Sequence, residues 1–376
     1  MIISKPNALQ EILFILKKYD LKKVMLITGK KSFELSGAKI FFDKNFSSND
    51  FVYFNDFDVN PKYEDVLRGS QIAIDNSIEL ILCIGGGSVM DMGKLIKAII
   101  PDYKNAKKIV SGNLPVPLKE NNIPLIMVPT TAGSGSESTH FAVVYINNKK
   151  YSVANQNLLP EFVFLDGNLV SNSNKYQKAC NVLDAISQSI ESAWAVGSST
   201  TSREISFRAL DLCMRSYQSY VNSDTNNANQ EMLIAANMAG QAINLSKTTA
   251  PHAWSYAISS SFNVPHGHAV WFTLPSIFEI HCSNKNLNLN PSIKKSDFIN
   301  TINKIKNIIG IGCTDNIKSF FSKMLSSIEI YADIERDIKT NQKIRKLLSE
   351  SVNVERLENN PVIFSNDDIK NIFKIN

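Results

Sequence analysis

The stretch Leu80-Ile-Leu-Cys-Ile-Gly-Gly-Gly-Ser-Val-Met-Asp-Met-Gly-Lys94 decides the fold of this 376-residue chain. Residues 80–84 are all apolar, as in a strand that is buried on both faces of a sheet. Glycines and a serine follow, and residues 90–100 then space their apolar side chains as a helix does. A buried strand that leads through glycines into a helix predicts a parallel sheet with crossover helices.

The segments on both sides of this stretch repeat the alternation of strand and helix. Amphipathic patterns predict helices from residue 33 onward and over residues 63–76. Apolar runs predict strands over residues 23–28, 51–54 and 125–128, and residues 141–145 and 162–165 predict a hairpin-like extension of the sheet. We therefore predict a doubly wound, mostly parallel α/β domain over residues 1–172.

The pattern changes near residue 172, where strand signals stop. Helical patterns then cover residues 179–196, 202–220, 229–245 and 253–260, with weaker helical segments toward the end of the chain. We therefore predict a second domain over residues 173–376 that consists of helices only.

Composition argues against several classes of protein. With 44% hydrophobic and 20% charged residues the chain resembles a globular protein, and no apolar run reaches the roughly 18 residues of a membrane span. The five cysteines form no Cys-x-x-Cys pair, and the first residues lack a signal-peptide pattern, so we expect a reducing, cytoplasmic location. The net charge of +5 comes without a nucleic-acid-binding motif, so we expect a small-molecule partner.

Two loops of small residues follow predicted strands. In Gly85-Gly-Gly-Ser88 the backbone can approach a pyrophosphate, and the helix behind it offers N–H groups and the positive end of its dipole. Pro129-Thr-Thr-Ala-Gly-Ser-Gly-Ser-Glu137 can wrap a ligand with hydroxyl and backbone donors. Both loops leave the carboxyl ends of strands, where open α/β sheets bind ligands. The alternative for the first loop is a turn whose glycines serve steric needs alone. For the second loop it is a flexible turn with a helix N-cap at Ser134 or Ser136.

Four polar side chains in the predicted helical domain suit a divalent cation. Asp184 and Gln188 are four residues apart, so a helix places them on one face, one turn apart. His252 and His266 begin two further segments. One carboxylate oxygen, one amide oxygen and two imidazole nitrogens suit Fe(II), Zn(II) or a similar ion. The alternative is a solvated aspartate and histidines that serve only as cap or core residues.

Together these motifs resemble the iron-containing (group III) alcohol dehydrogenase family. The resemblance rests on residues 85–94, on residues 129–137, on Asp184-Ala-x-x-Gln188-x-x-Glu191, and on His252 with Pro265-His266-Gly267, in matching order and spacing. Within the family, residues 190–196, 242–252 and 357–362 are similar to the phosphonoacetaldehyde reductases. The resemblance implies a dinucleotide-binding domain followed by a helical metal-binding domain, an architecture shared with dehydroquinate synthase.

The resemblance also implies roles for individual residues. The metal ligands are Asp184, Gln188, His252 and His266, and Gln188 stands where most members of the family have histidine. An amide oxygen is a weaker donor than imidazole, so metal affinity or identity can differ here. Tyr256 stands where histidine is common, and a phenol can pass a proton. The implied cofactor-binding positions are Gly85, Gly86, Gly87, Ser88, Asp91, Thr130, Thr131, Thr139 and Lys150.

The resemblance further predicts which nicotinamide cofactor is used. Members that prefer NAD(H) place an aspartate after the first strand, and that position here is Gly29, followed by Lys30 and Lys31. Gly29 leaves room for a 2′-phosphate, and Lys30 or Lys31 offers it a positive charge. We therefore expect NADP(H) to be preferred over NAD(H). The alternative is that these lysines are simply solvated.

The implied reaction is metal-assisted hydride transfer between a nicotinamide and a short aldehyde or alcohol, carried out by a homodimer. Lys247, five residues before His252 and among hydroxyl-bearing neighbours, predicts an anionic substrate such as phosphonoacetaldehyde, with Arg203 as a second anion-binding candidate. Lys247 can equally be a solvated cation at a helix C-terminus. Three alternatives remain open: a general short-chain or lactaldehyde-type dehydrogenase, a dehydroquinate synthase-like lyase, and a protein that has lost metal binding at Gln188.

Overall fold

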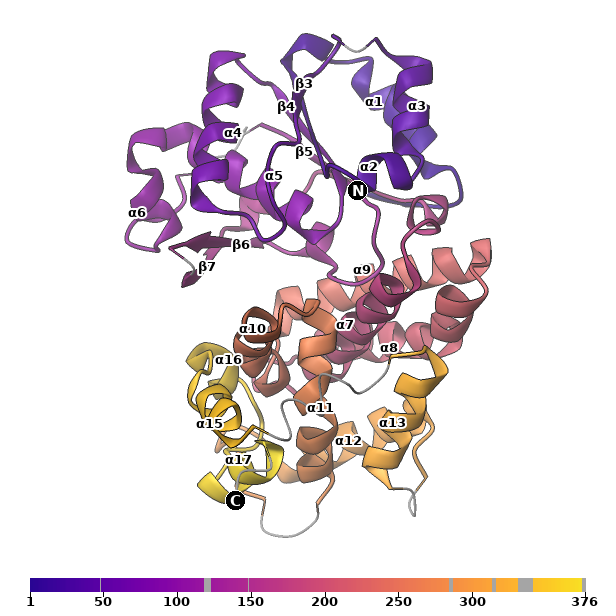
Figure 1. Ribbon diagram of the computed structural model, residues 1–376, viewed down its shortest axis with the longest axis vertical. Coiled ribbons are helices and arrows are strands. Elements are labelled where there is room, and N and C mark those ends of the chain that lie inside the picture. Colours follow the sequence, from indigo (N-terminus) through magenta and orange to yellow (C-terminus); the bar gives the residue numbers. More distant parts are fainter. Residues whose placement is uncertain are drawn as a thin grey trace. The chain divides into compact units, whose positions relative to one another are not determined.

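A computed structural model describes residues 1–47, 49–117, 123–147, 149–283, 287–312, 316–330 and 341–373 (Figure 1). The chain divides into two compact units. The first comprises Met1–Ser173 and Thr225–Asn237, and the second comprises Asn174–Asp224 and Met238–Asn376. Residues 225–237 thus lie beyond residue 172 in sequence but group with the first unit.

A six-stranded sheet forms the centre of the first unit. Its strand order is β1-β8-β5-β4-β2-β3, and every neighbouring pair is parallel. The strands are β1 (Ile2–Ser4), β2 (Val24–Thr28), β3 (Val52–Phe54), β4 (Leu80–Gly85), β5 (Leu125–Pro129) and β8 (Phe162–Leu165). The predicted doubly wound parallel sheet is confirmed.

Helices cover both faces of this sheet. Their bounds are α1 (Ile12–Leu16), α2 (Ser32–Leu35), α3 (Ala38–Asn45), α4 (Tyr63–Asp75), α5 (Gly87–Ile99) and α6 (Ala106–Val110). Successive strand residues point to opposite faces, so Leu26 of β2 joins the core that α1 and α3 cover. Its neighbour Ile27 joins the core that α4 and α5 cover. Burial on both faces explains why these strands read as unbroken apolar runs.

The predicted hairpin-like extension of the sheet is wrong. Residues 141–146 form β6 (Phe141–Ile146), which pairs antiparallel with β7 (Lys149–Ala154) in a separate two-stranded sheet. Residues 162–165 are instead β8, which lies between β1 and β5 in the parallel sheet. The polar segment that forms β7 has no apolar run of its own, so only its pairing with β6 makes it a strand.

The second unit is helical throughout its regular described elements. They are α7 (Lys175–Trp194), α8 (Thr200–Asn222), the end of α9 (Asn226–Ser246), α10 (Ala250–Phe262), α11 (His266–Cys282), α12 (Lys295–Ile309), α13 (Ile317–Ser327), α15 (Gln342–Glu350), α16 (Val354–Glu358) and α17 (Asn366–Phe373). Helix α7 is buried from Lys178 to Trp194 and packs against α8, α11 and α12. The predicted helical C-terminal part is confirmed. Among the described helices, none has the length and apolar character that crossing a membrane requires.

Candidate functional site

Helix α7 presents two of the predicted ligands on one face. Asp184 and Gln188 lie one turn apart, and Nε2 of Gln188 donates to Oδ1 of Asp184 over 3.0 Å. Both side chains are buried with the rest of the helix. Burial raises the pKa of Asp184, but the His252 hydrogen bond and the nearby imidazoles outweigh it and leave that pKa below its usual value. Asp184 is therefore a carboxylate, the form that binds a cation.

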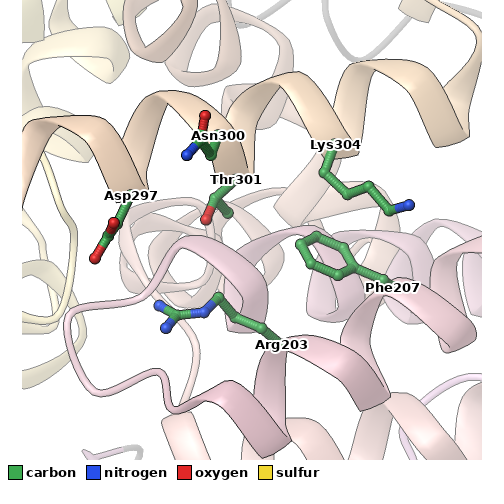
Figure 2. A pocket seen from close by; sticks show the side chains of 6 residues that line it. All are labelled: Arg203, Phe207, Asp297, Asn300, Thr301 and Lys304. Carbon is green, nitrogen blue, oxygen red and sulfur yellow. The ribbon is translucent and has the colours of Figure 1, made fainter.

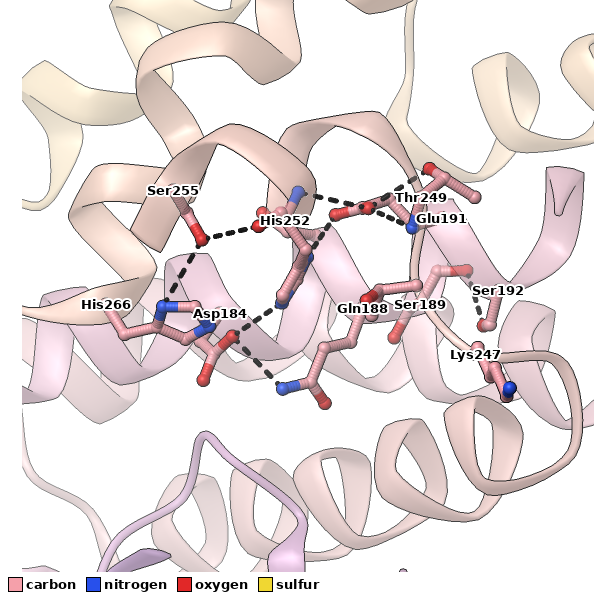
Figure 3. Close-up of polar contacts among 12 residues, drawn as sticks. Asp184, Gln188, Ser189, Glu191, Ser192, Lys247, Thr249, His252, Ser255 and His266 are labelled. Carbon is pink, nitrogen blue, oxygen red and sulfur yellow. Dashed lines mark hydrogen bonds and ion pairs between the residues drawn. The ribbon is translucent and has the colours of Figure 1, made fainter. Parts of the chain in front are cut away.

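Two histidines approach Asp184 from the first turns of other helices (Figure 3). His252 lies in the first turn of α10, with its Nε2 3.4 Å from Oδ1 of Asp184. His266 begins α11, and its ring centre lies 5.1 Å from that of His252. One possible ligand atom from each of the three side chains lies within 4.8 Å of the other two. We call Asp184, His252 and His266 the metal cluster.

Gly267 allows α11 to bring His266 close to α7. A Cβ atom at Gly267 would lie 2.0 Å from the carbonyl oxygen of Cys180 and 2.8 Å from the backbone nitrogen of Asp184. No side chain fits in that space, so glycine is required for the two backbones to approach. His266 reaches Asp184 because the next residue lacks a side chain.

The donor set fits a divalent cation. One carboxylate and two imidazoles at these separations suit Zn(II) or Fe(II). The local charge fits as well: burial lowers the pKa of His252, but Glu191 and Asp184 more than offset it and raise that pKa to about 10. A positive charge is thus favoured at this position.

Gln188 is brought to the edge of the metal cluster through its contact with Asp184. Its amide nitrogen faces Asp184, and turning the amide over would exchange the positions of nitrogen and oxygen. The assignment of Gln188 as the fourth ligand stays a prediction.

Tyr256 and Lys247, the residues predicted to act on the substrate, have different surroundings. Tyr256 lies one turn beyond His252 on α10, and its ring stacks on that of His266 with centres 5.6 Å apart and planes 3° from parallel. Lys247 lies between α9 and α10, and its Nζ is 2.6 Å from Oε1 of Glu355. The structure brings Tyr256 to the metal cluster and gives Lys247 an acidic partner, Glu355, outside it.

Arg203 lines a cavity of about 250 Å³ between α8 and α12 (Figure 2). Its Nη1 donates to Oγ of Ser198 over 3.0 Å. The other lining residues are Phe207, Asp297, Asn300, Thr301 and Lys304. None of the predicted metal ligands is among them, so the structure places this second anion-binding candidate in a cavity that the metal cluster does not line.

Glu191 contacts a predicted ligand, although the motif that contains it predicted no role for it. It lies three residues after Gln188 on α7, is fully buried, and places Oε1 2.5 Å from Nδ1 of His252. Its spacing was a usable signal, because residues i, i+4 and i+7 share one face of a helix.

In the first unit, the two loops of small residues lie side by side. Strands β4 and β5 are neighbours, and N of Thr130 donates to O of Gly85 over 2.9 Å. A Cβ atom at Gly86 would lie 3.3 Å from the Thr131 side chain. No side chain caps the start of α5, and Oγ1 of Thr130 is buried without a hydrogen-bond partner among the described residues. Such unsatisfied groups fit an anionic ligand such as a pyrophosphate.

The side chain of Lys94 anchors the second loop of small residues, residues 129–137, and the residues after it through hydrogen bonds. Its buried Nζ donates to O of Ser136 over 2.5 Å, to Oγ1 of Thr139 over 2.8 Å and to O of Phe141 over 2.9 Å. Burial lowers the pKa of Lys94 to about 8 against the opposing charge of Asp91, which itself accepts from Oγ of Ser136 over 2.6 Å. Asp91 and Thr139 thus have protein partners, and their contact with a cofactor stays a prediction.

The residues predicted to select the cofactor follow β2. Gly29 comes directly after the strand, and Nζ of Lys30 lies 3.2 Å from Oδ1 of Asp56. Both charged side chains are largely exposed, so this ion pair contributes little to stability, and Lys30 can pair with another anion instead. Lys150 lies on β7, and Ser88 in the first turn of α5 accepts from N of Asn60 over 3.0 Å. Their roles toward a cofactor stay predictions.

Comparisons with known proteins match nearly the whole chain to family models. Residues 1–167 match the model described as iron-containing alcohol dehydrogenase. Residues 178–376 match the model described as Fe-containing alcohol dehydrogenase family, C-terminal.

Individual relatives are similar over shorter segments. The probable alcohol dehydrogenase EutG of Escherichia coli is 27% identical over 265 residues, which are 67% of this chain and 66% of that protein. The phosphonoacetaldehyde reductase of Streptomyces viridochromogenes is 28% identical over 204 residues, 52% of this chain and 51% of that protein. The chain thus aligns with between half and two thirds of the length of these two relatives.

A solved structure shares the fold over the full length of the chain. It is the sulfoacetaldehyde reductase of Bifidobacterium kashiwanohense in complex with NAD+, with a TM-score of 0.84 and 24% identity. The match covers 100% of this chain and 96% of that one.

Proposed function

Because the chain belongs to the iron-containing alcohol dehydrogenase family, we propose that it interconverts a small aldehyde and its alcohol with a divalent cation and a nicotinamide cofactor. The observation that carries this proposal is the metal cluster, in which three helices place one carboxylate and two imidazoles within 4.8 Å of one another. In the direction of reduction, aldehyde, reduced nicotinamide and a proton become alcohol and oxidised nicotinamide.

The proposed roles at the metal site belong to side chains of the second unit. Asp184, His252 and His266 hold the cation, with Gln188 as the fourth ligand. When bound, the cation supplies Lewis acidity at the substrate oxygen and the nicotinamide supplies or accepts the hydride. The hydroxyl of Tyr256, whose ring stacks on that of His266, passes the proton to the product oxygen.

The loops at the ends of β4 and β5 are proposed to bind the pyrophosphate of the cofactor, which we expect to be NADP(H) rather than NAD(H). Gly29 has no carboxylate that would repel a 2′-phosphate, and Lys30 can leave its exposed pairing with Asp56 to bind one. Gly29→Asp should shift selectivity toward NAD(H). The Cβ of an aspartate at position 29 would clash with Oγ of Ser32, but that side chain can rotate away. Equal kcat/KM with both cofactors in the wild type would contradict the preference.

The proposed substrate is a short aldehyde with an anionic group, phosphonoacetaldehyde first. The similarity to the phosphonoacetaldehyde reductase supports it, as does the cationic Lys247, which precedes His252 by five residues. We also expect a homodimer, as the family resemblance suggests, and a cytoplasmic location, as the scattered cysteines suggest.

The function is tested on protein purified without chelator, by metal analysis and by NADPH oxidation with phosphonoacetaldehyde, propanal and lactaldehyde. Turnover should require metal and be lost in His266→Ala. His268→Asn is the matched control, because His268 lies two residues along α11 and bonds to Tyr176 instead. Faster turnover of propanal or lactaldehyde than of phosphonoacetaldehyde would mean that the protein is a general alcohol dehydrogenase. Absence of both metal and turnover in the wild type would refute the proposed enzyme.

A further inference from the structure

Glu191 uses both oxygens of its carboxylate at the start of helix α10. Its Oε1 lies 2.5 Å from Nδ1 of His252. Its Oε2 accepts from N of Thr249 over 2.8 Å, from Oγ1 of Thr249 over 3.1 Å and from N of His252 over 3.4 Å. The side chain is 0% exposed. A carboxylate this deeply buried has lost its hydration, and these donors replace the water.

The contacts with backbone N–H groups cap α10 from another helix. Thr249 is the N-cap residue of α10, and its own side chain makes no capping hydrogen bond. Glu191 accepts from the N–H of this residue and from that of His252, the third residue of the helix. The second of these N–H groups is one that an N-cap side chain ordinarily satisfies. A negative charge at this end of a helix is also favourable. Glu191 therefore sets the position of the turn that carries His252.

The contact between Glu191 and the imidazole of His252 decides which ring nitrogen faces Asp184, the carboxylate of the metal cluster. When Nδ1 of His252 donates to Glu191, Nε2 points the other way, and it lies 3.4 Å from Oδ1 of Asp184. The imidazole binds a metal in its neutral form, after giving up one of its two protons. Holding the remaining proton on Nδ1 leaves the lone pair on Nε2. We propose that Glu191 is a positioning residue that fixes the orientation and tautomer of His252 for metal binding. This inference rests on the proposed metal-dependent function.

Only a carboxylate satisfies all of these donors. Both of its oxygens accept, one from the imidazole and the other from the backbone of α10. In Glu191→Gln the shape is kept, but one of the two positions becomes an NH2 group that cannot accept. Either the imidazole or the backbone N–H of Thr249 then faces another donor. We therefore expect the His252 ring to rotate or its proton to move from Nδ1 to Nε2. Either change should lower the affinity of the site for a metal ion.

The test is titration of the metal-free full-length protein with Co²⁺ and Zn²⁺ in the wild type, Glu191→Gln, Glu191→Asp and Ser192→Ala. The visible absorption of bound Co²⁺ reports its ligand geometry without any turnover. We expect Glu191→Gln to weaken Co²⁺ binding by about 10- to 100-fold and to change the absorption band. Glu191→Asp keeps two acceptors and should recover part of the affinity. Ser192→Ala is the matched control, because buried Ser192 follows on α7 and bonds to Ser206.

The outcomes separate this inference from the proposed function. Unchanged Co²⁺ affinity and spectrum in Glu191→Gln would overturn the role of Glu191 and leave the metal site standing. A wild type that binds neither ion would refute the proposed function, and the inference with it. If affinity merely follows the urea midpoint of tryptophan fluorescence across all the variants, Ser192→Ala included, Glu191 supports folding only and the proposal is wrong.

Discussion

At the scale of single residues, the ion-pair partner of Lys247 determines whether its ammonium group can bind a substrate anion. Lys247 pairs with Glu355 at the surface, with the two side chains 52% and 61% exposed. An ion pair this open to water typically contributes less than about 1 kcal/mol. A substrate anion can therefore compete with Glu355 for the ammonium group.

Lys247→Ala should raise KM for phosphonoacetaldehyde about tenfold, because a charge-assisted hydrogen bond of about 1.5 kcal/mol is lost. The KM for propanal, which has no anionic group, should change little. Steady-state kinetics with both aldehydes measure the effect. Glu355→Ala is the control, since it frees the ammonium and should leave KM for the phosphonate equal or lower. Equal losses for both aldehydes would contradict anion binding by Lys247.

His281 makes stability depend on pH. Burial lowers its pKa from 6.5 to about 3, so the folded chain keeps this imidazole neutral. Between these values the unfolded chain binds a proton that the folded chain does not. Stability therefore falls as pH drops below 6.5, by up to about 1.4 kcal/mol per pH unit. His281→Gln should reduce this slope between pH 6.5 and pH 4 in urea unfolding followed by tryptophan fluorescence. Parallel curves for the two proteins would show that His281 titrates normally.

At the scale of elements, the metal cluster exists because three helices meet at one point. Asp184 comes from the middle of α7, whereas His252 and His266 come from the first turns of α10 and α11. The contact of α11 with α7 passes through Gly267, where the two backbones leave no room for a side chain.

Gly267→Ala should destabilise the protein by about 1–3 kcal/mol, because the added methyl group overlaps the carbonyl oxygen of Cys180. The sign of this stability change is informative, because replacing glycine by alanine within a helix ordinarily stabilises a protein by up to about 1 kcal/mol. His266 should move with α11, so Zn²⁺ affinity should fall as well. Urea unfolding and Zn²⁺ titration measure the two effects. Unchanged or higher stability would show that α11 does not need this close approach.

At the scale of the whole molecule, we expect the proposed metal binding to be coupled to folding. The proposed ligands lie on three helices, so the unfolded chain has no preformed site, and a cation bound there stabilises the folded state. All three tryptophans, Trp194, Trp254 and Trp271, lie in the second unit, so their fluorescence reports the unit that holds the metal cluster.

Removing metal should lower the thermal midpoint detected by tryptophan fluorescence. Zn²⁺ at about 100 times its Kd should restore about 2.7 kcal/mol. In His266→Ala the same addition should have little effect, because a ligand is missing. An equal shift in His266→Ala would mean that Zn²⁺ stabilises the protein from another site.

Much of the fold could be predicted because its signals are local. The apolar run 80–84 and the helical spacing after it depend only on neighbouring residues, and the structure contains β4 and α5 there. The same holds for Asp184 and Gln188, whose four-residue spacing places them on one face of α7 whatever surrounds the helix. Both are properties of the backbone repeat, so the sequence alone was sufficient for them.

Only the tertiary structure decided which distant residues meet. It paired β6 with the polar segment 149–154, moved residues 162–165 into the parallel sheet, and gave Lys247 the partner Glu355. It also placed Glu191 against His252, a contact between residues 61 positions apart. Strand pairing and charge partners are set by packing between segments far apart in the chain, and no local periodicity encodes them.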